Sequence, residues 1–178
     1  MARRPSTLDQ PRFAEWVRAS KGVRPIEPAL IPLIEGLGRV EARLRFEDAQ
    51  YLAVPRTKPL EVEEYFALVE RVTVSRLWVL GAYEVARTLS QRVRDKPSLA
   101  NARVRDRINR TKKYLERVRI PLAKFEPSRR HANTDFSDPP LTFHPQHGVA
   151  WKIAKRTIVP RQKVADRLLK LCVALKES

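Results

Sequence analysis

The segment from Pro59 to Arg94 constrains the fold of this chain more than any other feature. Proline is favourable in the first turn of a helix, and the three glutamates that follow Pro59 complement the positive end of the helix dipole. A helix over this range is about 50 Å long at 1.5 Å per residue. Its stretch Val72–Leu89 is apolar on nearly every side. Such a helix must be covered by others, so we predict a long central helix.

A short helix is expected at the N-terminal end. Asp9 can cap it, and Gly22 lies just past its end near Ser20. Phe13 and Trp16 then lie on one face. Because exposed aromatic side chains are unfavourable, we expect this face to dock on the body of the same protein rather than on a partner.

Three more helices and one hairpin are predicted from apolar spacing. The expected segments are a helix from Pro28 or Pro32 to about Tyr51, a helix from Ser98 to Pro121, a hairpin over Val149–Val159 and a helix over Pro160–Leu175. Pro121 is expected to end or kink the second of these helices. The sequence therefore predicts a mainly α protein. It is a helical bundle of four to five helices with a long central apolar helix and a small β-hairpin before the C-terminal helix. We expect residues 1–24 to form an N-terminal arm and residues 25–178 to form a single domain.

Positive charge is concentrated in the second half of the chain. Residues 1–90 carry 14 Lys and Arg against 12 Asp and Glu, a net charge of +2, whereas residues 91–178 carry 22 against 8, a net charge of +14. A concentrated positive field attracts polyanions. This asymmetry is the main indication of a partner, and it favours nucleic acid.

The helix expected after Ser98 is the first candidate site. Its apolar residues recur in a heptad pattern, so they should face the protein and leave the basic residues in solvent. Only Asp106 and Glu116 are acidic there. The alternatives to phosphate contact are a solubilising face and an acidic protein partner. The residues expected to contact phosphate, together with a following loop, are Arg103, Arg107, Arg110, Lys112, Lys113, Arg117, Arg119, Arg129, Arg130 and His131.

A second candidate is the polar set within the central helix, formed by Arg76, Tyr83, Glu84 and Arg87. Charges among apolar residues must be paired or solvated. We favour a buried ion-pair network that holds the bundle together. A polar pocket with Glu84 as a base and the arginines as anion ligands is the alternative, and an exposed stripe is the third.

The third candidate is the proline-rich stretch 125–147, which contains all three histidines, His131, His144 and His147. Their spacing does not match a standard zinc signature, so we predict no metal site. His131 could act as an acid–base group with Arg129 and Arg130 on the phosphate, as in a metal-independent nuclease. Simple phosphate contact by this loop is favoured.

The remaining sequence features limit the cellular setting in which this protein is expected. The single cysteine, Cys172, falls in an apolar helical stretch, which favours a buried, inert thiol. The first ten residues have no apolar core typical of a secretory signal, and the stretch Leu77–Leu89 is too short to span a bilayer. We therefore expect a cytoplasmic protein that does not bind membranes.

The function favoured by the sequence is non-catalytic binding of nucleic acid through its phosphate backbone, with no cofactor. No Gly-rich phosphate loop, nucleophile elbow or kinase signature occurs, so an enzyme is the less favoured interpretation. The alternatives are the nuclease based on His131 and a structural subunit that packs on a partner protein. The sequence does not distinguish RNA from DNA and does not indicate an oligomeric state.

Overall fold

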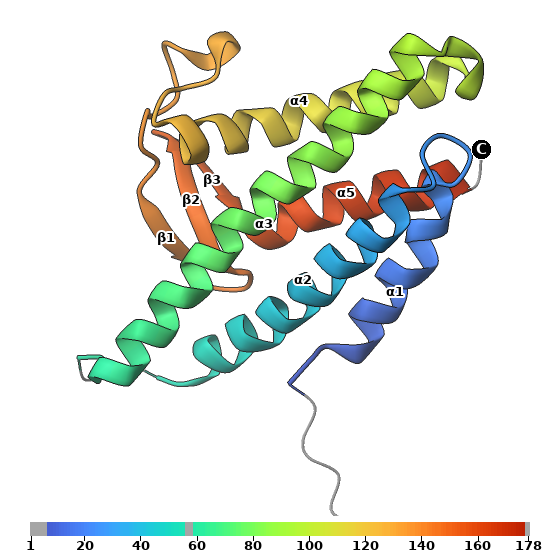
Figure 1. Cartoon of the computed structure of the whole chain (residues 1–178). Helices are drawn as coiled ribbons and strands as arrows, with labels where there is room; N and C mark the ends of the chain where they lie inside the picture. The colour runs from blue at the N-terminus through green and yellow to red at the C-terminus, as the bar shows by residue number, and fades with distance from the viewer. Residues whose placement is uncertain (1–6, 56–58, 177–178) are drawn as a thin grey trace, which may run out of the picture.

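The protein is a helical bundle with a small sheet attached to one side, as a computed structural model shows (Figure 1). The structure describes residues 7–55 and 59–176, so the first six residues of the predicted arm lie outside it. The elements are α1 (Gln10–Ser20), α2 (Leu30–Ala53), α3 (Val62–Asp95), α4 (Ala102–Lys124), β1 (Leu141–His144), β2 (Gly148–Ala154), β3 (Thr157–Pro160) and α5 (Arg161–Lys176), with short 3₁₀ turns at Lys21–Val23, Pro97–Leu99 and Arg129–His131. The prediction of a mainly α bundle with a small β element before the last helix is confirmed.

The long helix α3 starts later than predicted. Glu61 caps it, and a reciprocal capping box with Glu64 satisfies the first free backbone groups, so the helix begins at Val62 rather than at Pro59. It contacts α2, α4 and α5, and Figure 1 shows it running diagonally across the front of the bundle. Residues such as Trp78 and Leu89 are buried, but Leu77 is largely exposed. Its apolar surface is therefore covered on most sides but open on one.

Helix α1 docks on the body of the protein through Trp16, which is fully buried. The Trp16 ring packs edge to face on Trp78 of α3, with 6.2 Å between centroids. Gly38 of α2 makes this contact possible, because a Cβ there would lie 2.4 Å from the Trp16 Cβ. The Trp78 indole N–H donates to the Leu37 carbonyl at 2.7 Å. The expectation that the aromatic face of α1 packs on its own chain is confirmed for Trp16.

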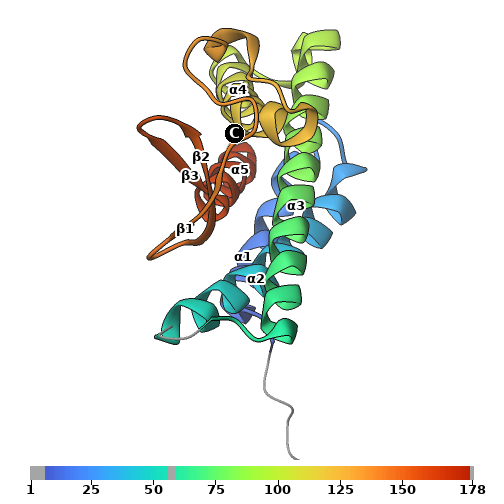
Figure 2. The same ribbon diagram turned by 90° about the vertical axis from the view of Figure 1, so that its left-hand side faces the viewer.

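The β element is a three-stranded antiparallel sheet with the strand order β1-β2-β3. The predicted hairpin corresponds to β2 and β3, which are joined at Lys155 and Arg156. Strand β1 was not expected, because the sequence placed its residues in a long loop. The sheet lies beside α5, on the opposite side from α3 (Figure 2), and β2 contacts both α2 and α5.

Buried charges connect α5, α2 and the sheet. Arg161, the first residue of α5, is fully buried, and its guanidinium donates to Asp48 Oδ2 at 2.8 Å. Its other terminal nitrogen lies 3.7 Å from Glu41 Oε1. Gly148 packs directly on the Asp48 carboxylate and has φ of 66°, so both the space and the backbone conformation favour glycine there.

Candidate nucleic-acid interface

Helix α4 orients the basic residues that the sequence singled out. Asn101 caps its first turn by accepting from the Val104 N–H at 2.9 Å. The whole predicted seam is buried, namely Val104, Ile108, Thr111, Leu115, Val118 and Leu122. The helix continues through the buried Pro121 to Lys124 instead of ending at the proline, and the chain turns at Phe125, with φ of 56°.

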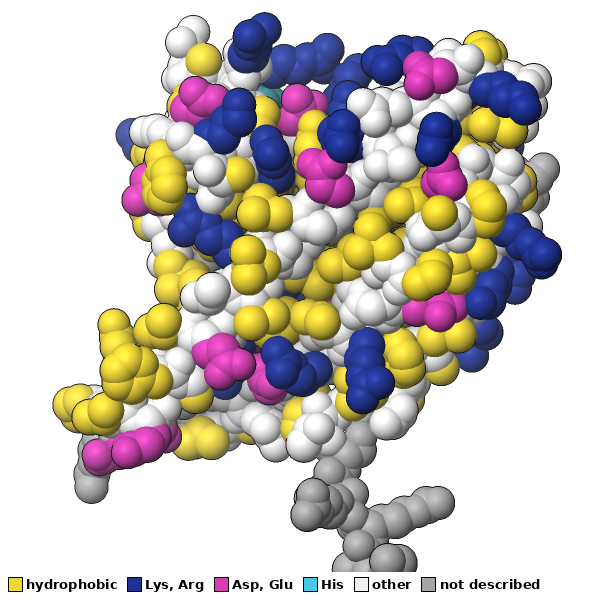
Figure 3. All heavy atoms as spheres, in the orientation of Figure 1, with side chains coloured by type: hydrophobic (Ala, Val, Ile, Leu, Met, Phe, Trp, Pro, Cys, Tyr) yellow, Lys and Arg dark blue, Asp and Glu magenta, His cyan; other side chains and the backbone are white. Residues whose placement is uncertain are grey.

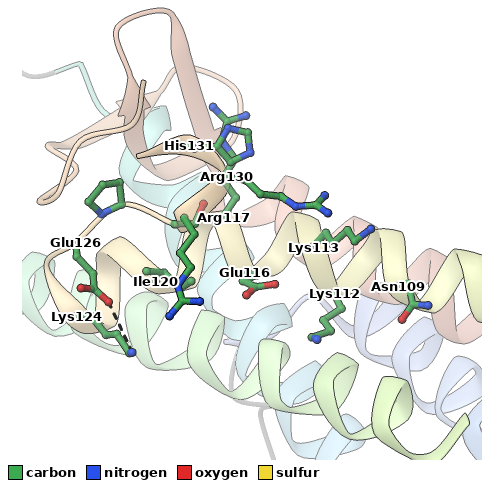
Figure 4. A pocket seen from close by; sticks show the side chains of 13 residues that line it. Asn109, Lys112, Lys113, Glu116, Arg117, Ile120, Lys124, Glu126, Arg130 and His131 are labelled. Carbon is green, nitrogen blue, oxygen red and sulfur yellow. Dashed lines mark ion pairs between the residues drawn. The ribbon is translucent and has the colours of Figure 1, made fainter. Parts of the chain in front are cut away.

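The first basic concavity, here called the loop cavity, lies between the second half of α4 and the segment 126–131 (Figure 4). Its volume is about 530 Å³. Six of the ten predicted phosphate ligands line it, namely Lys112, Lys113, Arg117, Arg129, Arg130 and His131. Lys124 adds a further cation, whereas Glu116 and Glu126 are the acids in its wall. The structure thus brings three of the helix candidates together with the loop candidates in one concave site.

Arg117 holds the loop against α4. Its Nε and one terminal nitrogen each lie 2.8 Å from an oxygen of Asp135, whose side chain is fully buried. Burial alone would raise the pKa of Asp135, but the hydrogen bonds and charge of Arg117 hold it below its usual value. Asp135 also forms a β-bridge with Ala154. Arg117 therefore positions the loop and has less guanidinium free for phosphate than its neighbours.

A second basic concavity, here called the α4–α5 groove, follows the opposite flank of α4. Two adjoining hollows of about 400 and 350 Å³ share Arg167 and Lys170 of α5. Arg107 and Arg110 of α4 complete the first, whereas Lys163 is in the second. The groove contains one acid, Asp166, in its lining.

The α5 residues of this groove were missed by the sequence analysis. Lys163, Arg167 and Lys170 recur at steps of four and three, and all three are exposed on one face of α5. The spacing of these basic residues is visible in the sequence, but the prediction for this helix used only its apolar residues. Tyr114, which lines the second hollow, is partly buried with the Arg167 guanidinium 5.6 Å from its ring centroid. Burial raises the pKa of Tyr114.

Two of the predicted phosphate ligands lie outside both concavities. Arg103 is exposed in the first turn of α4, and it lines neither the loop cavity nor the α4–α5 groove. Arg119 turns toward α3, where its guanidinium lies 5.1 Å from the Tyr83 ring centroid. We therefore assign Arg119 to packing between α3 and α4.

The polar set of the central helix lies along the junction of α3 with α4. Arg76 donates to the Leu122 carbonyl at 2.6 Å. Arg87 pairs with Glu84 within the same helix, and both side chains are about two-fifths exposed. Burial raises the pKa of Tyr83. None of the four residues lines the loop cavity or the α4–α5 groove.

The histidines are divided between two places. His131 lines the loop cavity, whereas His144 and His147 stack on each other at the turn between β1 and β2, with 4.6 Å between ring centroids. Within residues 7–55 and 59–176, no group of three His, Cys, Asp or Glu side chains is arranged to hold a metal ion. No helix in the same ranges is long and apolar enough to cross a bilayer.

In comparisons with known proteins, no family model, no curated protein and no solved structure matches this chain.

Proposed function

We propose that this protein binds nucleic acid without cleaving it, and that it does so mainly by contacting the phosphate backbone. The observation that carries the proposal is the enrichment of cations in the two concavities flanking α4. The loop cavity has six Lys and Arg against two acids, and the α4–α5 groove has five against one. Ordinary solvated helix faces mix the two signs, so such an excess favours a polyanion over a solubilising face.

The two concavities would act together through the exposed ridge of α4 between them. Lys113 and Arg110 lie on this ridge, next to the loop cavity and the groove respectively. A backbone that crosses the ridge can therefore be contacted on both sides of one helix. Contacts of this kind position a nucleic acid without reading its sequence. We expect little sequence preference.

Salt dependence tests the proposal. If about six phosphates are neutralised, affinity for a labelled duplex DNA or single-stranded RNA should fall by about a thousandfold between about 50 and 200 mM salt. The assay is fluorescence anisotropy with the full chain. Absence of binding at the lower salt concentration would contradict the proposal.

A charge-reversal pair provides the matched control. Arg107→Glu with Arg110→Glu removes cations from the α4–α5 groove, whereas Arg18→Glu with Arg39→Glu makes the same charge change at exposed positions of α1 and α2. The first pair should weaken binding by at least about a hundredfold, and the second by less than about tenfold. Equal losses would show that net charge, rather than this surface, determines affinity.

Cleavage by His131 is tested on the same samples. His131 lines the loop cavity together with Arg129 and Arg130, so an acid–base group and phosphate ligands occur in one concave site. The present proposal expects intact nucleic acid on a denaturing gel. Cleavage that His131→Ala abolishes, with binding unchanged, would replace the binding function by a nuclease.

A further inference from the structure

One face of α3 carries an apolar stripe that the rest of the protein leaves exposed. Val62, Phe66 and Leu77 are 65%, 63% and 59% exposed, and Val69 between them is also exposed. These positions recur at helical spacing, and Leu80 continues the line. The stripe is about 27 Å long at 1.5 Å per residue. It is named the α3 stripe here.

Aromatic residues dominate the first turns of the α3 stripe. Tyr65 is more than half exposed, and its ring lies 5.6 Å from that of Phe66. Figure 3 shows hydrophobic side chains gathered where α3 begins, with acidic side chains beside them. Only the small, exposed Thr73 interrupts this line, between Val69 and Leu77. An exposed apolar patch of this kind is unfavourable in water and indicates an interaction surface. Exposed aromatic residues are also the type that most often anchors a protein interface.

Two carboxylates border the α3 stripe on one side. Glu63 and Glu70 are exposed and lie within a right angle of Phe66 around the helix axis. Neither forms an ion pair with another described residue. On the other side, Arg76 is engaged with the Leu122 carbonyl. Among residues 7–55 and 59–176, the free charge beside the stripe is therefore negative, although the chain as a whole has a net charge of +16.

The charges argue against a second copy of this chain as the occupant. A symmetric antiparallel pair of α3 helices centred on the stripe has its two-fold axis near position 71. That axis places Glu70 of one copy next to Glu70 of the other. On the same side of the pair, no Lys or Arg of the second α3 helix lies opposite Glu63. Like charges in such close contact oppose association. The stripe fits a different helix, whose edge is positive.

We propose that the α3 stripe is a docking site for an amphipathic helix of another protein, with an aliphatic seam and Lys or Arg along one edge. The seam packs on Phe66 and Leu77, and the basic edge meets Glu63 and Glu70. This is helix-on-helix recognition through anchors at helical spacing. It uses a surface distinct from the basic concavities, so it does not depend on the proposed function.

Two designed peptides of about 20 residues test the proposal, long enough to cover the α3 stripe. Both carry leucine at the seam positions, and one has Lys on the edge where the other has Glu. Binding to the full chain is measured by fluorescence anisotropy. The Lys peptide should bind at least about tenfold more tightly. Because the whole protein is strongly positive, this preference can come only from a local acidic surface.

Protein variants localise the binding. Glu63→Lys with Glu70→Lys should reverse the preference between the peptides, and Phe66→Ser should abolish binding of both. Phe66 is exposed, so far-UV circular dichroism and urea unfolding should show that Phe66→Ser remains folded. Nucleic-acid binding should not change in this variant.

Three results would overturn the proposal. One is failure of both peptides to bind the wild-type chain. Another is unchanged peptide binding by the folded Phe66→Ser variant. The last is a dimer mass in light scattering that Phe66→Ser converts to a monomer, which would identify a second copy as the occupant. Loss of nucleic-acid binding in the groove variants would leave the docking proposal unaffected.

Discussion

Replacing Arg161 by methionine should strongly destabilise the protein. Arg161 is fully buried and is 2.8 Å from Asp48 and 3.7 Å from Glu41. Glu41 keeps other partners without it, because it accepts from the Trp16 indole and from Arg12, each at 3.0 Å. Asp48 loses its direct guanidinium donor and remains buried.

Removing one partner of a buried ion pair costs about 3–5 kcal/mol, because the other charge stays buried without compensation. With a urea m-value of about 2 kcal/mol per molar, the unfolding midpoint should fall by about 1.5–2.5 M. Arg156→Met, in the exposed turn between β2 and β3, is the control and should change stability by less than about 0.5 kcal/mol. Urea unfolding followed by circular dichroism measures both.

A double variant separates charge from packing. Asp48→Asn keeps the size of the side chain, so Arg161→Met with Asp48→Asn should be at least about 1 kcal/mol more stable than Arg161→Met alone. A loss below about 1 kcal/mol for Arg161→Met, or no gain from the second substitution, would refute the ion-pair explanation.

The stability of the Arg161→Met variant should depend on pH through the Asp48 carboxyl. Burial raises the pKa of this carboxyl, while Arg161 and then Arg71 lower it. Without Arg161 the folded pKa rises further above the unfolded value. The folded variant then binds a proton more tightly than the unfolded chain, so its stability falls as pH rises between the unfolded and folded pKa values. The deficit relative to wild type should therefore be smaller at about pH 5 than at about pH 8.

Four further predictions concern single residues. Gly148→Ala should lower the free energy of unfolding by more than about 1–2 kcal/mol, because Gly148 has φ of 66° and a Cβ there would lie 2.1 Å from the Asp48 Cγ. Gly36→Ala should raise the free energy of unfolding by up to about 1 kcal/mol, because no atom lies within 4 Å of the added Cβ. Urea unfolding measures both. Cys172 is buried with its pKa raised by burial to about 12, so a thiol reagent should modify it only after unfolding. Arg117→Ala should increase hydrogen exchange across residues 129–136, because it removes the ion pair that holds the loop on α4; unchanged exchange would contradict that role.

Several helices were predictable because their apolar residues repeat within the segment itself. The heptad seam of α4 and the span of α5 appear as expected. The start of α3 was misplaced by three residues, because the choice between Pro59 and the Glu61 capping box depends on local geometry that periodicity does not report. Strand β1 was missed because its four residues are mostly half-exposed and acquire their pairing only from β2.

The candidate site was predictable in composition but not in shape. The sequence alone determined that α4 would have a buried apolar side and a basic exposed side, since that division follows from 3.6 residues per turn. It could not determine that segment 126–131 closes one flank of α4 and α5 the other. Those contacts, like the pairing of Arg161 with Asp48 across 113 residues, join parts of the chain with no shared periodicity. Tertiary packing decided them, because only the folded core brings such distant segments within contact distance.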